Sequence, residues 1–151
     1  MSVEIRLLTV DELRDSADDL FVQHRDEIAT MPDIMQISPF WDAYYVAEEK
    51  GGLFILGGVD GDSVVAYSVN FVAPNLHYSA LYCTTNDLLF VADGYRNSKL
   101  GLRLMRETES EARRRGCALM FWHAKPNSAL SAICQRPGYG VQDIIYHKRL
   151  T

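Results

Sequence analysis

Apolar and polar residues recur along the first third of the chain in patterns that predict one strand and two helices. Apolar residues alternate with polar ones over residues 3–7, which predicts a short strand. Thr9 and Glu12 then form a capping-box pattern, and an amphipathic helix is expected to follow until Pro32 ends it. Ser38-Pro39 predicts the start of a second helix, which stops near Lys50. The apolar stripe of the first helix consists of Leu13, Ala17, Leu20, Phe21, His24 and Ile28.

The middle of the chain is rich in β-forming residues. Residues 53–59 and 64–72 are two apolar runs that flank Asp60-Gly61-Asp62, a spacing typical of a hairpin. A longer β run extends from about Tyr78 to Val91. These segments predict three consecutive strands.

The last third predicts helices and strands in alternation. After Val91 a long amphipathic helix is expected to stop at Gly116, with Leu100, Leu104, Met105, Thr108 and Ala112 along its apolar side. Residues 118–124 form a compact apolar strand, residues 126–138 a short helix, and residues 141–150 a final strand. The order β-α-α-β-β-β-α-β-α-β predicts an α/β fold in which helices flank a mixed sheet. We expect a single domain spanning residues 1–151.

Composition narrows the class of protein. Hydrophobic residues make up 48% and charged residues 23% of the chain, which excludes a disordered segment. The net charge of -5 argues against nucleic-acid binding, and no apolar run approaches the ~20 residues that span a membrane. The three cysteines and four histidines have no metal-like spacing, so no metal is expected. The first residues lack the shape of a signal peptide, which predicts a cytoplasmic protein with reduced thiols.

The stretch from Leu88 to Leu102 carries the most specific chemical signal. An apolar strand ends at Val91, and a polar loop containing Arg96 and Lys99 leads directly into the long helix. Such a junction aims unpaired backbone N–H groups and the positive end of a helix dipole at one point. It predicts binding of a cofactor that carries a pyrophosphate. The alternative is a plain strand-to-helix turn whose basic side chains are solvated.

Two motifs in register give this chain its family resemblance. The first is Val91-x-x-x-Tyr95-Arg96-x-x-Lys99-Leu100-Gly101, which resembles the V-x-P-x-Y-R-x-x-G-I-G signature of the GNAT superfamily of acyl-CoA-dependent N-acyltransferases. The second runs from Asn127 to Gly138-Tyr139 and is similar to the N-x-x-A…Y-x-x-x-G-F segment of that family. The resemblance implies a GNAT-like fold, acetyl-CoA as co-substrate and an amine as acetyl acceptor.

The chain departs from the family pattern at three positions. Lys99 stands where the first motif glycine is usual, and Asp93 replaces the customary proline. Cys134 occupies the position where many members have a tyrosine that protonates the departing CoA thiolate. The first two departures leave cofactor binding through backbone amides intact, whereas the third leaves the acid step without its usual residue.

The resemblance also implies which residues bind the cofactor. Backbone groups of the strand before the loop would pair with the pantetheine arm, and loop and helix amides would hold the pyrophosphate. Asn127 would bind the pantetheine from the neighbouring junction, or else serve as a helix cap before Ser128. The residues implied for the strand are Leu89, Phe90 and Val91, and those implied for the pyrophosphate are Arg96, Asn97, Ser98, Lys99, Leu100, Gly101 and Leu102.

An amine acceptor requires a base. At a lysine-like pKa of ~10.4 only about one amine in 10³ is neutral at pH 7. In the family such bases often lie four and six positions before the motif valine, which gives Asp87 and Thr85 here. Strand alternation predicts that both share a face with Leu89 and Val91, and Asp87 is the better acceptor of a proton. Its alternative role is to cap the strand or to pair with an arginine, and Cys134 is either the acid or buried helix filler.

The acceptor side is less specified by the sequence. His123 either lines the acceptor site or is a satisfied histidine at a strand end, and Trp122 and Tyr82 have the same two interpretations. The second predicted helix carries an aromatic set that either walls the acceptor pocket or belongs to the core, namely Phe40, Trp41, Tyr44 and Tyr45. The sequence therefore predicts an N-acetyltransferase, and a catalytically silent CoA-binding or protein-binding module is the alternative. Homodimers are common in the family, and we expect a homodimer here only by analogy with it.

Overall fold

A five-stranded mixed sheet forms the centre of the computed structural model, which describes residues 2–151. The strands lie in the order β1-β2-β3-β4-β5, so each strand neighbours the next in the chain. The pairs from β1 to β4 are antiparallel, and β4 and β5 are parallel. The strands are β1 (Glu4–Leu8), β2 (Leu53–Asp60), β3 (Ser63–Pro74), β4 (Tyr82–Val91) and β5 (Leu119–Phe121). The predicted mixed α/β class is confirmed.

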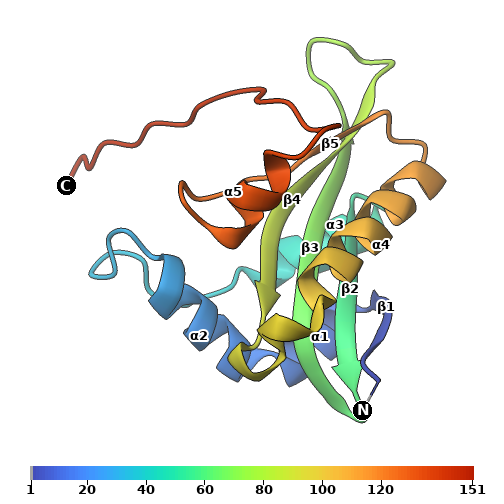
Figure 1. The fold of residues 1–151 in the computed structure, drawn as a ribbon. Coiled ribbons are helices and arrows are strands. Elements are labelled where there is room, and N and C mark those ends of the chain that lie inside the picture. The colour runs from blue at the N-terminus through green and yellow to red at the C-terminus, as the bar shows by residue number, and fades with distance from the viewer. Residues whose placement is uncertain (1) are drawn as a thin grey trace.

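Helices cover both faces of the sheet (Figure 1). Helix α4 lies on one face, while α1 and α3 lie on the other. The helices are α1 (Val10–Ser16), α2 (Asp18–Ile28), α3 (Trp41–Glu49), α4 (Leu100–Arg114) and α5 (Ala129–Cys134), and a 3-10 turn, η1, spans Asp93–Ser98. Within the described part of the chain, none of these helices has the length and apolar character that crossing a membrane requires.

Alternation along β2 builds two hydrophobic cores. Leu53 and Ile55 face the core under α1 and α2, whereas Phe54 and Leu56 face the core under α4. Because both faces are covered, β2 is a continuous apolar run. On the α4 side, the predicted apolar stripe of the long helix is confirmed, since Leu100, Leu104, Met105, Thr108 and Ala112 are all buried.

The first predicted helix is interrupted. The Thr9–Glu12 capping box is present, but Ala17 has φ -119° and ψ 7°, which ends α1 and separates it from α2. Five of the six stripe residues are still buried, either on the two helices or, for Ala17, between them, and Ile28 at the end of α2 is the exposed one, at 38%. Helix α3 likewise begins at Trp41, after the predicted Ser38-Pro39 start.

A β-bulge interrupts the pairing of β3 with β4. Val69 pairs with Leu88, but the next residue, Asn70, pairs with Asn86, so Asp87 is the extra residue on β4. A bulge shifts the alternation of faces along a strand. Consequently Leu89 and Val91 pack under α4, whereas Thr85, beyond the bulge, pairs with Phe71 on the face of α3. The prediction that Thr85 and Asp87 share a face with Leu89 and Val91 was wrong for this reason.

The C-terminal segment also differs from its prediction. Residues 141–150 form no strand but run away from the sheet beyond α5, with Val141, Ile145 and Leu150 at least 76% exposed (Figure 1). Alternating apolar residues make a strand only where a neighbouring edge lies alongside, and this segment has none in the described chain. Its end is held by an ion pair from Arg149 to Asp33, 2.7 Å long.

Three other predicted elements are shorter in the structure. Strand β4 starts at Tyr82 because residues 75–81 form a loop in which Asn75 Oδ1 accepts from the backbone of His77 and Tyr78. Strand β5 pairs only over Leu119–Phe121. Helix α5 covers Ala129–Cys134 of the predicted 126–138.

Candidate active site

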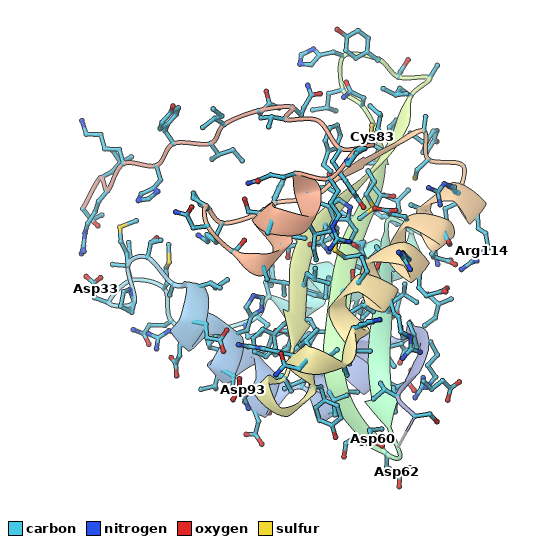
Figure 2. All side chains as sticks on the ribbon, viewed as in Figure 1. Asp33, Asp60, Asp62, Cys83, Asp93 and Arg114 are labelled. Carbon is cyan, nitrogen blue, oxygen red and sulfur yellow. The ribbon has the colours of Figure 1, made fainter. Side chains whose placement is uncertain are left out.

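The junction between β4 and α4 presents free backbone N–H groups. Strand β4 ends at Val91, η1 follows, and α4 begins at Leu100. The first-turn amides of a helix have no partner within it, and no side chain caps this helix. No acidic residue lies in its first turn, so the positive end of the dipole is not neutralised. Asp93, at the start of η1, is the last acid before the helix and is exposed (Figure 2). This helix end can receive an anion.

Lys99 adopts the left-handed conformation, with φ 61° and ψ 9°. Glycine adopts this region without strain, which gives the physical reason for the glycine usual at this motif position. The motif glycine that is present, Gly101, is open, because a Cβ there would meet only Val91 Cγ2, at 3.7 Å. Packing within the chain therefore does not require a glycine at position 101. The missing side chain leaves room for a ligand close to the backbone.

The Arg96 side chain turns away from the helix end. Its Nη2 donates to both carboxylate oxygens of Glu27 on α2, at 2.6 and 2.8 Å. Its Nε donates to the carbonyl of Val91 at 3.0 Å, and its guanidinium lies over the ring of Phe90. The charged side chain of Arg96 therefore binds the loop to α2. The side chain of Lys99, in contrast, is exposed to solvent.

Strand β4 has an open edge beside this junction. It pairs with β5 only at Cys83, Thr84 and Thr85. From Asn86 to Val91 it has no strand partner on that side among residues 2–151. An extended molecule with amide groups can pair with such an edge as an added strand. The open edge leads directly to the uncapped end of α4.

Some of the residues predicted to bind the cofactor have side chains that a ligand cannot reach. The side chains of Phe90 and Leu100 are buried in the two cores, at 5% and 1% exposed, so only their backbones can serve a ligand. Ser98 donates its hydroxyl to the carbonyl of Tyr95, at 2.5 Å. The backbones of all the predicted residues in this region lie along the open edge of β4, η1 and the start of α4. These residues are Leu89 to Val91 and Arg96 to Leu102.

Asn127 does not cap α5. Ser128 does so, with its Oγ accepting from the backbone N–H of Ser131 at 3.1 Å. Asn127 is exposed and has φ 60°, a left-handed conformation that asparagine tolerates better than most residues. Its side chain stays a predicted ligand for the pantetheine side.

Asp87, the extra residue of the bulge, interacts electrostatically with two ionisable side chains from other parts of the chain. Partial burial raises the pKa of its carboxyl, and the charge of His123 beyond β5 acts in the opposite direction. Burial raises the pKa of Tyr44 on α3 to about 12, and the negative charge of Asp87 adds to this rise. The bulge therefore brings Asp87, Tyr44 and His123 into one electrostatic neighbourhood. A carboxylate with a raised pKa is suited to accept a proton near neutral pH.

The aromatic residues around α3 serve different places. Tyr44 contacts both Trp41 and Phe71, with ring centroids 5.3 and 6.4 Å apart, on the face that also holds Thr85. Tyr45 instead donates its hydroxyl to Asp11, at 2.5 Å. Phe40, which precedes α3, is 70% exposed. Only part of the predicted aromatic set therefore lies on the Asp87 side.

Cys134 lies at the end of α5 in a partly buried position. Burial raises the pKa of its thiol, and the negative charge of Glu109 raises it further. Tyr139 donates its hydroxyl to Glu109 Oε1 at 2.6 Å, and Trp122 Nε1 donates to the same oxygen at 3.2 Å. No histidine contributes to the environment of the thiol, so nothing in the described chain favours the thiolate.

Comparison with known protein families decides the class. The sequence profile of the acetyltransferase (GNAT) family matches residues 11–134, which include β4, η1 and α4. The chain belongs to the GNAT acetyltransferase family. Among curated proteins, none matches its sequence.

Solved structures of GNAT acetyltransferases share the whole fold. An aminoglycoside acetyltransferase from an uncultured soil metagenomic sample is 16% identical with a TM-score of 0.72, and the match covers 100% of this chain and 99% of that one. A ribosomal-protein-alanine N-acetyltransferase from Brucella melitensis biovar Abortus 2308 is 13% identical with a TM-score of 0.73, covering 99% and 100%. A Trypanosoma brucei acetyltransferase is 14% identical with a TM-score of 0.71, covering 99% and 100%.

Two residues near the candidate site were not identified from the sequence. Glu27 has no local signal, because its partner Arg96 is 69 positions away. Asn86 does have one, since asparagine and aspartate are depleted in strands and Asn86-Asp87 interrupts an otherwise β-rich run. Such a pair in a strand interior is a signal for a bulge.

Proposed function

We propose that this GNAT protein is an N-acetyltransferase that moves an acetyl group from acetyl-CoA to an amine by direct attack in a ternary complex. The observation that carries the proposal is the open edge of β4 leading into the uncapped N-terminus of α4. The first feature suits an extended chain with amide groups, and the second suits a pyrophosphate. Acetyl-CoA has both, in that order.

Backbone groups do most of the cofactor binding in this proposal. The amides from Lys99 to Leu102 would hold the pyrophosphate, and Lys99 would add a positive charge. Along the strand, Leu89 to Val91 would pair with the pantetheine arm, with the Val91 carbonyl already accepting from Arg96. Acetyl-CoA supplies an activated acyl group, a thioester. N–H groups near Val91 would donate to its carbonyl oxygen and polarise it.

Asp87 would act as the base. The amine nitrogen forms a bond to the acyl carbon, the carbon–sulfur bond breaks, and the proton of the amine passes to the Asp87 carboxylate directly or through a water. The raised pKa of Asp87 supports this role, because a carboxylate of ordinary pKa is a weaker base at neutral pH. Tyr44 and His123 would bound the acceptor side.

The leaving thiolate needs a proton. Cys134 stands at the position of the family's tyrosine, and its raised pKa keeps the thiol protonated, as a proton donor must be. Thiols are weak hydrogen-bond donors, so we assign Cys134 a small contribution that water can replace.

The acceptor is proposed at the level of an amine. Two of the solved relatives are an aminoglycoside acetyltransferase and a ribosomal-protein-alanine N-acetyltransferase, whose acceptors both carry amines. A net charge of -5 favours the approach of cationic molecules over anionic ones. Polyamines, aminoglycosides and peptides with free N-termini therefore form the first panel of acceptors.

The experiment has two stages. Calorimetric titration with acetyl-CoA and with CoA should show micromolar binding of both, and Gly101→Trp should abolish it, because the indole would occupy the open space at the helix start. Release of CoA is then followed with the amine panel. Asp87→Asn should lower kcat by about 10² to 10⁴, the range of general base catalysis. Asp62→Asn, on the β2–β3 turn far from the bulge, is the matched carboxylate control and should leave kcat unchanged (Figure 2).

Three results would separate the alternatives. Absence of binding up to millimolar acetyl-CoA would overturn the acetyltransferase proposal. Binding without turnover on any amine of the panel would favour the catalytically silent module. Turnover that survives Asp87→Asn would assign the base to another group or to solvent.

A further inference from the structure

Four polar side chains lie inside the apolar core between the sheet and α4. They belong to three different elements, and each is at most 2% exposed. No side chain in the described part of the chain leaves a buried nitrogen or oxygen atom unpaired. The four are Ser68 and Asn70 on β3, Asn86 on β4 and Thr108 on α4, and we call them the buried polar network.

Asn86 connects this network to the two sides of the bulge. Its Nδ2 lies 2.9 Å from Asn70 Oδ1 and 3.0 Å from the carbonyl oxygen of Leu88. The carbonyl oxygen of Val69 is 3.3 Å away. Leu88 and Val69 are the last regular pair before the register shifts, and Asp87 is the residue between Asn86 and Leu88. One amide group therefore spans the place where the ladder is interrupted.

The other end of the network reaches α4. Asn70 Nδ2 donates to Ser68 Oγ at 3.0 Å, and Ser68 Oγ lies 3.0 Å from Thr108 Oγ1. Thr108 also bonds to the carbonyl of Leu104, one turn earlier on α4, at 2.8 Å. Helix α4 begins at the proposed pyrophosphate site, so the network joins that helix to the bulge that carries Asp87.

Burying polar side chains in an apolar core costs free energy, so the presence of this network calls for an explanation. Burying amides and hydroxyls is favourable only when they are fully bonded, and apolar residues of similar shape often serve stability as well or better. Asparagine is also a poor strand residue. The stability of the sheet therefore does not explain why an asparagine stands at position 86. Its hydrogen bonds to carbonyl groups at the bulge do explain it, because a bulge disrupts the regular pairing of the two strands at that point.

We infer that Asn86 is a positioning residue for the proposed acetyl transfer, which holds the β4 bulge in place, so that Asp87 stays in the neighbourhood that it shares with Tyr44 and His123. The inference rests on the proposed function for its kinetic consequence. Without the bulge, regular alternation would carry Asp87 away from its present place on the strand. Misplacement of a reacting group by about 1 Å costs on the order of 10² in rate.

The test compares three buried substitutions. Asn86→Leu removes the amide but keeps the branching and the number of side-chain heavy atoms, and Ser68→Ala cuts the link to α4 with a smaller perturbation. Thr84→Val is the matched control, because Thr84 is fully buried on the same strand and bonds only to Cys117 Sγ, outside the network. Each variant is assayed for acetyl-CoA binding, kcat, KM and the pH dependence of kcat/KM.

A second readout does not need turnover. The carboxyl carbon of Asp87 is titrated by NMR in the intact protein and in each variant. The ionisable groups in its electrostatic neighbourhood, Tyr44 from α3 and His123 from the segment after β5, are unchanged in all three variants. A shift in the Asp87 titration therefore reports its position.

We expect Asn86→Leu to lower kcat by about 10- to 100-fold with little change in acetyl-CoA affinity. Its Asp87 titration should move toward the ordinary aspartate range, because the carboxyl loses its partial burial, and the acidic limb of the pH profile should move to lower pH. Ser68→Ala should change both readouts in the same direction by less, and Thr84→Val should change neither.

Each opposite outcome would overturn the inference. These are an unchanged Asp87 titration in both network variants, or an equal change in Thr84→Val. If Asn86→Leu does not fold, the comparison of Ser68→Ala with Thr84→Val decides alone. If Asp87→Asn keeps full turnover, the proposed base fails, while the NMR titration still decides whether Asn86 holds the bulge.

Discussion

The guanidinium of Arg96 is bound by the carboxylate of Glu27, although the motif position of Arg96 suggests a residue that faces phosphate. Its Nη2 lies 2.6 Å from Oε1 and 2.8 Å from Oε2. Together with the bond from Nε to the Val91 carbonyl, this contact fastens the loop to α2. The arginine therefore holds the loop from behind, and in the proposed function the backbone amides are the groups that bind the anion.

This relationship predicts the effect of Glu27→Gln on acetyl-CoA binding. If Arg96 holds the loop, loss of the carboxylate should weaken binding by about two- to fivefold, the effect of ~0.5–1 kcal/mol for a solvent-exposed ion pair. Calorimetric titration measures the change in Kd. Asp26→Asn, which alters the neighbouring acid paired with Arg25, is the control and should have no effect. Tighter binding in Glu27→Gln would show instead that a released Arg96 reaches the phosphates.

Lys99→Gly should stabilise the protein. A residue other than glycine with φ 61° is strained, and glycine relieves this strain by about 0.5–1 kcal/mol. Urea denaturation measures the change in the free energy of unfolding. Lys50→Gly is a useful contrast, because Lys50 ends α3 in the right-handed conformation, with φ -80°, and glycine there should destabilise. A loss of stability in both variants would contradict the argument from the left-handed conformation.

His24 should make stability depend on pH. It is 8% exposed, its Nδ1 lies 2.8 Å from Tyr67 Oη, and burial lowers its pKa from 6.5 to about 4. The folded protein therefore binds the proton less readily than the unfolded chain. The stability that the neutral histidine contributes, roughly 3 kcal/mol at most, is present above pH 6.5 and is lost as the pH falls toward 4.

Denaturation curves between pH 7 and pH 4 measure this contribution. The free energy of unfolding should fall over this interval, and His24→Gln, which keeps a polar group but does not titrate, should flatten the dependence. An equally steep fall in His24→Gln would mean that carboxylates account for the whole pH effect.

Cys134→Ala should lower kcat by less than about tenfold, below the usual range of general acid catalysis, since water can protonate the departing thiolate. Cys134→Tyr, which restores the residue usual in the family, should keep or raise kcat. Steady-state release of CoA measures both. Mass spectrometry of the protein with acetyl-CoA and no amine should find no acetyl group on Cys134, because its raised pKa disfavours the nucleophilic thiolate. Detection of that adduct would indicate a covalent route.

Local patterns in the sequence are sufficient for much of the fold. The stripe from Leu100 to Ala112 and the turn at Asp60-Gly61-Asp62 identified α4 and the β2–β3 hairpin, because helical periodicity and turn chemistry depend only on near neighbours. The junction from Val91 to Leu100 was also predicted, since strand, loop and helix start are consecutive in the chain. The predicted final strand over 141–150 failed because alternation does not supply a neighbouring edge.

The parts of the site that escaped prediction depend on register or on distant partners. The extra residue at Asp87 shifts the pairing by one position. Relative to alternation counted back from Val91, the side chains that precede Asp87 on β4 therefore lie on the opposite face, and the count itself does not reveal this. The hydrogen bonds of Arg96 with Glu27 and the electrostatic interaction of Asp87 with Tyr44 join residues that are far apart in the sequence. No local pattern encodes such pairs, so the site residues themselves stay predictions until the variants are assayed.

The open edge of β4 also bears on the solubility of the protein. The backbone from Asn86 to Val91 has no strand partner on this side, so a strand of another chain can add there, which is the usual first contact in aggregation of β proteins. Only the portion beyond Thr85 is exposed in this way, because β5 covers the rest. A ligand that occupies this edge therefore shields it as well as binding to it. If acetyl-CoA binds there as proposed, its depletion would leave the protein prone to edge-to-edge association.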